Sequence, residues 1–155
     1  MNSFPLSQKY IDFINTTNVS AEFLEGTTAS GKTTVGAGVK FMRMVSQSPK
    51  KLHAIAAKTT GKAEETIIQQ DNGILDLHRN AIYCGNGDKD YKLPHIKFEG
   101  KVIYILGYSS RDKWEMVLGA QFGCVYIDEI NTADIEFIRE MSTRNRLYAC
   151  NLEPR

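Results

Sequence analysis

Short apolar runs alternate with longer segments of helical character along the chain. The apolar runs predict strands at residues 21–25, 52–57, 102–106, 124–127 and 147–151. Because these runs are continuous and do not alternate with polar residues, we expect strands covered on both faces, as in a parallel sheet. A weaker pair of runs at 81–84 and 95–98 brackets a polar loop and predicts a β-hairpin.

Helices are predicted at residues 7–15, 32–46, 63–70, 111–118 and 133–143. For the last of these, Asn131 or Thr132 is the expected cap, and Asp134 adds negative charge to the first turn. The expected apolar face of this helix consists of Ile135, Ile138 and Met141. The alternation of strands and helices predicts a single α/β domain with a mainly parallel central sheet.

The composition is that of an ordinary globular domain. Of 155 residues, 42% are apolar and 24% are charged, which excludes collagen-like, disordered and disulfide-stapled chains. The net charge of +1 does not indicate a nucleic-acid binder or a membrane-surface protein. Between Glu25 and Glu64, however, there are seven basic residues and no acidic one. This segment is either a solvated helix face with its loop or an edge that faces phosphate or DNA.

Cysteines and histidines give no sign of a metal site. The three cysteines form no CxxC pair, and His53, His78 and His95 lie far apart in the sequence. Cys124 and Cys150 lie in apolar runs, where buried thiols are expected. No secretion signal is visible, and no apolar stretch approaches the roughly 20 residues that span a bilayer. We therefore expect a soluble, intracellular protein with reduced cysteines.

The strongest motif is a phosphate-binding loop, G-x-x-x-x-G-K-[ST], at residues 26–33. Its glycines let backbone N–H groups point at phosphates, and the helix that follows adds its positive N-terminal end. Lys32 is expected to reach the β- and γ-phosphates, and the Thr33 hydroxyl to coordinate Mg²⁺. The candidate nucleotide contacts are Gly26, Thr27, Thr28, Ala29, Ser30, Gly31, Lys32, Thr33 and Thr34.

A second motif is an apolar run that ends in the acid pair Asp128-Glu129. A buried strand of this kind delivers carboxylates to the edge of the sheet. Asp128 is the candidate second ligand of Mg²⁺, opposite Thr33. Glu129 is the candidate general base that orients a water molecule for attack on the γ-phosphate. The pair favours hydrolysis of ATP over transfer of phosphate to another substrate.

Four further residues are candidates with weaker signals. Gln8, upstream of the first strand, is a candidate for reading the adenine edge. Asn151 ends the last predicted strand and is a candidate sensor of the γ-phosphate. Arg144 and Arg146 either stabilise the transition state or complement the dipole of the preceding helix.

The order of these signals resembles the ATPase domain of the large terminase subunit of tailed bacteriophages, the motor that packages DNA. Besides Gln8, the phosphate loop and the acid pair, the resemblance rests on residues 54–59, 102–107, 111–119 and 144–151. It implies a three-layer P-loop NTPase fold of the RecA/ASCE-like type. It also implies that the Asn151 strand inserts between the phosphate-loop strand and the Asp128 strand, and that Asn151 couples hydrolysis to DNA movement.

The resemblance further implies ATP and Mg²⁺ as cofactors and double-stranded DNA as a partner, bound through its phosphates without sequence preference. A portal protein, a small terminase subunit and a homo-oligomeric ring are implied in the cytoplasm of a bacterial host, with no membrane. Many members carry an arginine in the phosphate loop, where this chain has residues 27–30 without one. The sequence continues for four residues after Asn151, so we expect an incomplete ATPase domain without the nuclease domain.

Two alternatives remain open at this point. One is another P-loop ATPase, of the helicase-like or remodelling kind. The other is a nucleotide-binding assembly module that hydrolyses little ATP. Glu129 argues against the module, because a binding-only site does not need a catalytic acid.

Overall fold

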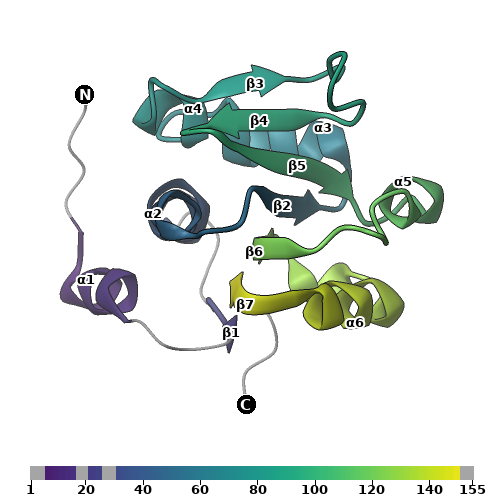
Figure 1. The fold of residues 1–155 in the computed structure, drawn as a ribbon. Helices are drawn as coiled ribbons and strands as arrows, with labels where there is room; N and C mark the ends of the chain where they lie inside the picture. The colour runs from purple at the N-terminus through teal and green to yellow at the C-terminus, as the bar shows by residue number, and fades with distance from the viewer. Residues whose placement is uncertain (1–5, 17–20, 26–30, 151–155) are drawn as a thin grey trace.

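A computed structural model of the chain describes residues 6–16, 21–25 and 31–150, with side chains up to residue 142 (Figure 1). The strands are β1 (Ala21–Glu22), β2 (Leu52–Ala57), β3 (Ile82–Cys84), β4 (His95–Phe98), β5 (Lys101–Gly107), β6 (Phe122–Ile127) and β7 (Asn145–Cys150). The α-helices are α1 (Gln8–Asn15), α2 (Met42–Gln47), α3 (Thr60–Ala63), α4 (Ile74–Leu77), α5 (Arg111–Glu115) and α6 (Ile135–Arg144). Two π-helical segments, η1 (Thr34–Phe41) and η2 (Glu64–Ile68), and a short 3₁₀-helix, η3 (Ile130–Thr132), complete the elements.

The strands form one seven-stranded sheet in the order β1-β7-β6-β2-β5-β4-β3. Five neighbouring strands pair in parallel: β1, β7, β6, β2 and β5. Strands β4 and β3 are antiparallel additions at the β5 edge. This confirms the predicted parallel sheet and hairpin. It also confirms the expected insertion, because β7 lies between β1, which precedes the phosphate loop, and β6, which precedes Asp128.

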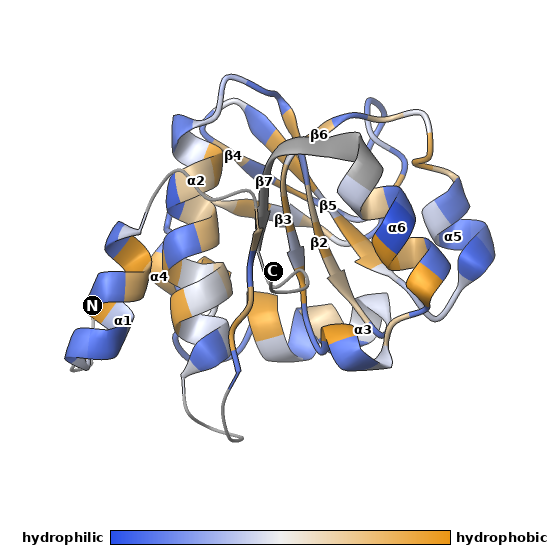
Figure 2. Cartoon of the chain, turned by 90° about the horizontal axis from the view of Figure 1, so that it is seen from below, coloured by the Kyte–Doolittle hydropathy of each residue, from blue (hydrophilic) through white to orange (hydrophobic). Residues whose placement is uncertain are grey.

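Helices cover both faces of the sheet, so the domain has three layers. On one face, residues of η1, α2 and η2 such as Phe41 and Ile67 pack on alternate strand residues such as Ile55. On the other face, Trp114 of α5 and Phe137 of α6 pack against Ala54 and its neighbours. Figure 2 shows hydrophobic residues along the central strands and on the helices that cover them. Among the described residues, every helix is too short or too polar to cross a lipid bilayer.

Several element boundaries differ from the predictions, and for one helix a local polar contact explains the difference. Helix α3 begins at Thr60, not at 63, because the Thr59 hydroxyl accepts a hydrogen bond from the N–H of Lys62 at 3.0 Å. Strand β1 is limited to Ala21–Glu22, and helix α5 ends at Glu115 instead of 118. Helix α4 was not predicted, since its four residues are too few for a visible periodicity.

The cap and the apolar face predicted for the last helix are both wrong in part. Neither Asn131 nor Thr132 caps α6; the Asp134 carboxylate does, accepting from the N–H of Glu136 at 2.8 Å. Ile135 is 64% exposed, whereas Phe137 and Met141 are fully buried. These two residues are four apart and therefore lie on the same side of the helix. The predicted burial of Cys124 is confirmed, and the side chain of Cys150 lies outside the described residues.

Candidate functional site

A cavity of about 770 Å³ opens at the carboxyl edge of the parallel sheet. Its walls come from the residues after β1, the helix start at Gly31–Thr34, the end of β6 and the α3–η2 segment. Lys32, Thr33, Asp128 and Glu129 all line it. The described end of the phosphate-loop motif, residues 31–33, and the acid pair thus line one cavity, at the edge where ligands bind in α/β sheets.

The helix that follows the predicted phosphate loop is held firmly against the sheet. Gly31 has a φ of +83°, a conformation that favours glycine, and its carbonyl oxygen accepts the N–H of Val35 at 2.9 Å. Lys32 and Thr33 form the first helical turn, in which N–H groups have no carbonyl partner within the helix, and both residues line the cavity. A Cβ atom on Gly36 would lie 2.7 Å from a methyl carbon of Leu24 and 3.1 Å from the Tyr126 ring. Glycine at this position therefore lets the helix approach β6 closely.

Asp128 and Glu129 differ in burial and in backbone conformation. The N–H of Asp128 donates to the carbonyl oxygen of Ala56 at 2.8 Å, which extends the pairing of β6 with β2 by one step. Burial raises the pKa of the half-buried Asp128 carboxyl, and the charge of Glu129 adds to this, whereas Lys32 and Lys62 act in the opposite direction. Glu129 is exposed and adopts the left-handed conformation, with a φ of +51°. A non-glycine residue held in this region stores backbone strain, which is typical of functional sites.

The other predicted site residues lie partly outside the cavity or outside the described residues. Gln8 lies on the exposed side of α1, where its amide nitrogen donates to Asp12 at 2.8 Å. The cavity lining does not include it, so its role at the adenine stays a prediction. Residues 26–30 and Asn151 lie outside the described residues, as do the side chains of Arg144 and Arg146. The roles predicted for all of these remain untested.

Thr66, Gln70 and Tyr108 are among the residues at this site that were not singled out from the sequence. Lys62, Thr66 and Gln70 line the cavity from α3, η2 and the turn after it. The hydroxyl of Tyr108, which follows β5, contacts the backbone of the Asp128–Glu129 turn. The sequence did indicate residues 58–62, because this segment follows a strand and precedes a helix and is therefore expected at the carboxyl edge of the sheet.

The basic segment between Glu25 and Glu64 does not form one surface. Lys32 and Lys62 line the cavity, whereas Lys50 and Lys51 precede β2 at the opposite end of that strand. Lys40 is 4% exposed, and its ammonium group pairs with Glu22 of β1 and donates to the carbonyl oxygen of Phe13. The segment therefore divides into cavity residues, a buried pair and solvated lysines, and does not make a continuous phosphate-facing edge.

Comparison with known proteins agrees with this architecture. The chain is similar to the large terminase of a thermophilic bacteriophage in three crystal structures: crystal form 2, the complex with ADP and the complex with ATP-γ-S. The respective sequence identities are 17%, 19% and 16%, and the TM-scores are 0.65, 0.67 and 0.65. The matches cover 95%, 94% and 94% of this chain but 39%, 38% and 38% of those chains. The chain thus spans about two-fifths of the length of these proteins and shares their fold.

A search of the curated proteins gave no match. A family model described as the terminase large subunit, T4likevirus-type, N-terminal, matches residues 23–148. This match begins directly after β1, runs into β7 and includes all the described residues that line the cavity. The chain therefore belongs to the family of T4-like-virus-type terminase large subunits, in the N-terminal part of that subunit.

Proposed function

We propose that this chain is the ATP-hydrolysing motor domain of a viral DNA-packaging terminase and couples hydrolysis to translocation of double-stranded DNA into a procapsid. The observation that carries the proposal is the meeting of Lys32 and Thr33 with Asp128 and Glu129 in one cavity. The ADP and ATP-γ-S complexes of the thermophilic phage's large terminase support a nucleotide as the ligand. Lys62, on the wall that α3 and η2 contribute, supplies a second cation for the phosphates.

Each residue has a distinct part in the proposed reaction. Gly31, Lys32 and the N–H groups of the helix start bind the β- and γ-phosphates. The Thr33 hydroxyl and the Asp128 carboxylate are oxygen donors of the type that holds Mg²⁺, which when bound neutralises charge on the phosphate oxygens. The cavity thus offers oxygen ligands for Mg²⁺ and two lysine ammonium groups, those of Lys32 and Lys62, for the phosphates of ATP.

Glu129 is the proposed base for the chemical step. Its carboxylate orients a water molecule and takes up its proton as the water oxygen forms a bond to the γ-phosphorus. The bond from the γ-phosphorus to the bridging oxygen breaks, and ADP leaves with the bonding electron pair. Glu129 is exposed and lines the cavity, so water has access to its carboxylate.

Turnover of ATP by the chain, with and without linear duplex DNA, tests this proposal. Glu129→Gln is expected to lower kcat by about 10²- to 10⁴-fold, the size of a lost general base, while nucleotide binding persists. Lys32→Ala is expected to abolish binding. Glu65→Gln is the matched control, since Glu65 is an exposed acid that does not line the cavity, and it should change neither.

Lys32-dependent binding without any turnover would favour a nucleotide-binding assembly module over a motor. Turnover that does not respond to DNA would favour an ATPase with another task, of the helicase-like or remodelling kind. DNA binding itself is expected to rest on phosphate contacts and therefore to weaken steeply between low and moderate salt. Binding to a portal protein, binding to a small terminase subunit and assembly into a ring belong to the same proposal.

A further inference from the structure

Three metal-binding side chains meet in the β3–β4 hairpin, at the opposite edge of the sheet from β1. Cys84 ends β3 and is the direct partner of His95, which begins β4. Asp88 comes from the loop between them. One ligand atom from each of the three residues lies within 4.8 Å of the other two. None of the three lines the cavity that contains Lys32 and Asp128.

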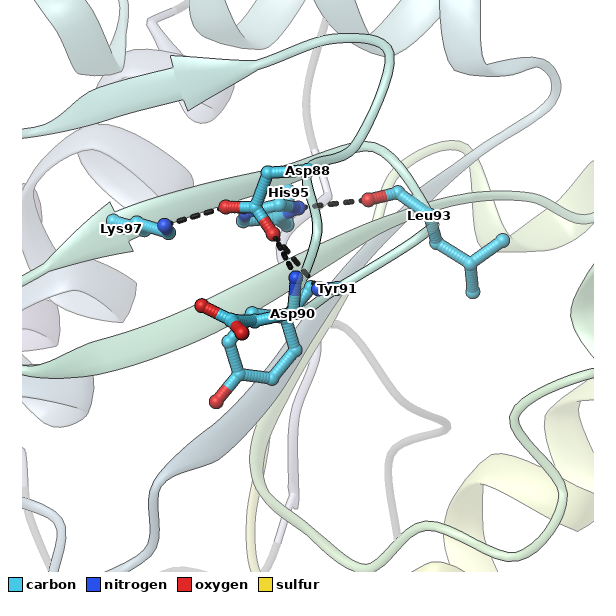
Figure 3. A network of polar contacts seen from close by, with 6 residues as sticks. All are labelled: Asp88, Asp90, Tyr91, Leu93, His95 and Lys97. Atoms are coloured by element: carbon cyan, nitrogen blue, oxygen red, sulfur yellow. Dashed lines mark hydrogen bonds and ion pairs between the residues drawn. The ribbon is translucent and has the colours of Figure 1, made fainter.

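His95 presents an unused nitrogen to this cluster. Its Nδ1 lies 2.7 Å from the carbonyl oxygen of Leu93, which can only accept, so Nδ1 carries a proton and Nε2 has a free lone pair in the neutral ring (Figure 3). His95 is fully buried, and among the described side chains its Nε2 is the buried polar atom without a hydrogen-bond partner. A ring held by a backbone carbonyl at one nitrogen and free at the other is the usual arrangement of a metal-ligating histidine.

Asp88 is oriented toward that nitrogen by its own loop. Its Oδ1 accepts from the N–H groups of Asp90 and Tyr91 at 2.9 and 2.8 Å, which leaves Oδ2 facing His95. Gly87 closes the loop with a φ of +72°, and a Cβ atom there would lie 2.2 Å from the Lys92 carbonyl oxygen. The loop can therefore hold Asp88 in place only with glycine beside it.

The distance between the two ligand atoms fits a small tetrahedral ion. Oδ2 of Asp88 lies 3.4 Å from Nε2 of His95. Tetrahedral Zn²⁺, with bonds of about 2.0–2.2 Å to nitrogen and oxygen, holds such ligands about 3.4 Å apart. The half-buried, free thiol of Cys84 supplies the third donor. A thiolate, an imidazole and a carboxylate together favour Zn²⁺ over Mg²⁺ or Ca²⁺.

We propose that Cys84, Asp88 and His95 bind a Zn²⁺ ion that ties the loop of the β3–β4 hairpin to both of its strands. A water molecule completes the tetrahedron, and the thiol proton is released to solvent as the Zn–S bond forms. The competing cation is Lys97, whose ammonium group lies 2.5 Å from Oδ2 of Asp88 (Figure 3). Since the Lys97 side chain is 42% exposed, it can leave the carboxylate and enter solvent when the ion binds.

The test is a titration of the metal-free, reduced chain with Co²⁺, a spectroscopic substitute for Zn²⁺. We expect one equivalent of Co²⁺ to give a thiolate-to-cobalt absorption band, which Zn²⁺ then removes by displacement. Cys84→Ser and Asp88→Asn should each abolish the band, while circular dichroism checks that the variants keep the fold. Asp90→Asn changes a neighbouring exposed acid outside the cluster and should leave the band unchanged.

Lys97→Met supplies a test in the opposite direction. Without the competing ammonium group, Co²⁺ and Zn²⁺ are expected to bind about tenfold more tightly, the effect of removing one charge-assisted hydrogen bond to the ligand. The proposal is overturned if the folded wild-type chain gives no thiolate band, if Cys84→Ser binds Co²⁺ as well as wild type, or if Lys97→Met weakens binding. These readouts do not depend on ATP turnover, so they stand whether or not the motor function is correct.

Discussion

The hydroxyl oxygen of Tyr108 lies 3.1 Å from the backbone carbonyl oxygen of Glu129, and 3.2 Å from that of Asp128. The same hydroxyl pairs with the Oγ1 of Thr132 at 2.6 Å, and the Tyr108 ring is buried against Phe137. Tyr108 therefore contacts and supports the turn in which Glu129 adopts its left-handed conformation. A residue after β5 thus positions the candidate catalytic acid after β6, although the two strands are not adjacent in the sheet.

Tyr108→Phe removes this hydroxyl without removing the ring. We expect a loss of stability of about 1 kcal/mol, the usual size of one hydrogen bond, and a larger relative fall in kcat because Glu129 loses its support. Urea unfolding and ATP turnover measure the two effects. Tyr104→Phe, which changes a tyrosine within β5 that is in ring contact with Tyr91 and Phe122, is the matched control. If kcat fell equally in both variants, the loss of activity would come from disturbance of the β5 region and not from lost support of the Asp128–Glu129 turn.

Lys62 is expected to contribute to nucleotide affinity. It lines the cavity with Lys32, and both lysines act on the pKa of Asp128 in the same direction. Lys62→Met should weaken ADP binding by about tenfold, as expected for loss of one charged contact to phosphate, and Lys62→Arg should retain most of it. Isothermal titration calorimetry with ADP measures this. Lys58→Met is the control, because Lys58 is exposed but does not line the cavity; an equal loss there would indicate a general charge effect.

The strands, and the positions of Lys32, Thr33, Asp128 and Glu129 at the edge of the sheet, could be predicted because their signals are local. A continuous apolar run that ends in Asp128 and Glu129 requires only a buried strand and a sheet edge. The five parallel strands and the hairpin follow from such runs. The position of β7 between β1 and β6 was expected from the family resemblance, since no local pattern reports strand order.

The features that the sequence did not reveal depend on contacts between distant residues. Cys84 and His95 meet only because of the register in which β3 and β4 pair across a ten-residue loop. A lysine in a helix is ordinarily solvated, and Lys40 is buried because Glu22, 18 residues earlier, lies beside it. The orientation of α6 was misjudged at Ile135 because packing against Trp114 selects Phe137.

Lys40 and Glu22 form a buried pair that joins η1 to β1. Their side chains are 4% and 12% exposed, and the Lys40 ammonium group also lies 4.1 Å from the centre of the Phe13 ring. Lys40→Met is expected to lower the free energy of unfolding by about 3–5 kcal/mol, since it leaves the Glu22 carboxylate buried without its partner. The double variant Lys40→Met, Glu22→Leu should recover most of this loss.

Urea unfolding of the wild type, both single variants and the double variant forms a double-mutant cycle, which measures the coupling energy between Lys40 and Glu22. A coupling energy near zero between the two substitutions would contradict a stabilising Lys40–Glu22 pair, because it would mean that each side chain contributes to stability independently of the other. Arg43→Met is a suitable control, since Arg43 lies in α2, which follows η1 directly, and is exposed. Its effect is expected to stay within about 0.5 kcal/mol.

His53 makes the stability of the fold depend on pH. It is fully buried, its Nδ1 accepts the N–H of Cys124 at 3.0 Å, and its Nε2 donates to the carbonyl oxygen of Lys50 at 3.0 Å. The Cys124 N–H lies where β6 shifts register against β7, so this contact satisfies a polar group at an irregular point of the sheet. Protonation of Nδ1 would replace that hydrogen bond with a repulsive contact. Burial accordingly lowers the pKa of His53 from its ordinary value of 6.5 to about 4.

Because the folded chain binds this proton less readily than the unfolded chain, His53 contributes stability above pH 6.5 that is lost as the pH falls toward 4. The free energy of unfolding is expected to fall by about 2 kcal/mol from pH 7 to pH 5 through this residue. His53→Asn keeps an acceptor near Nδ1 but does not titrate, so urea midpoints of this variant should vary less over that range. If the free energy of unfolding changed equally with pH in the wild type and in His53→Asn, the acid sensitivity would belong to other groups.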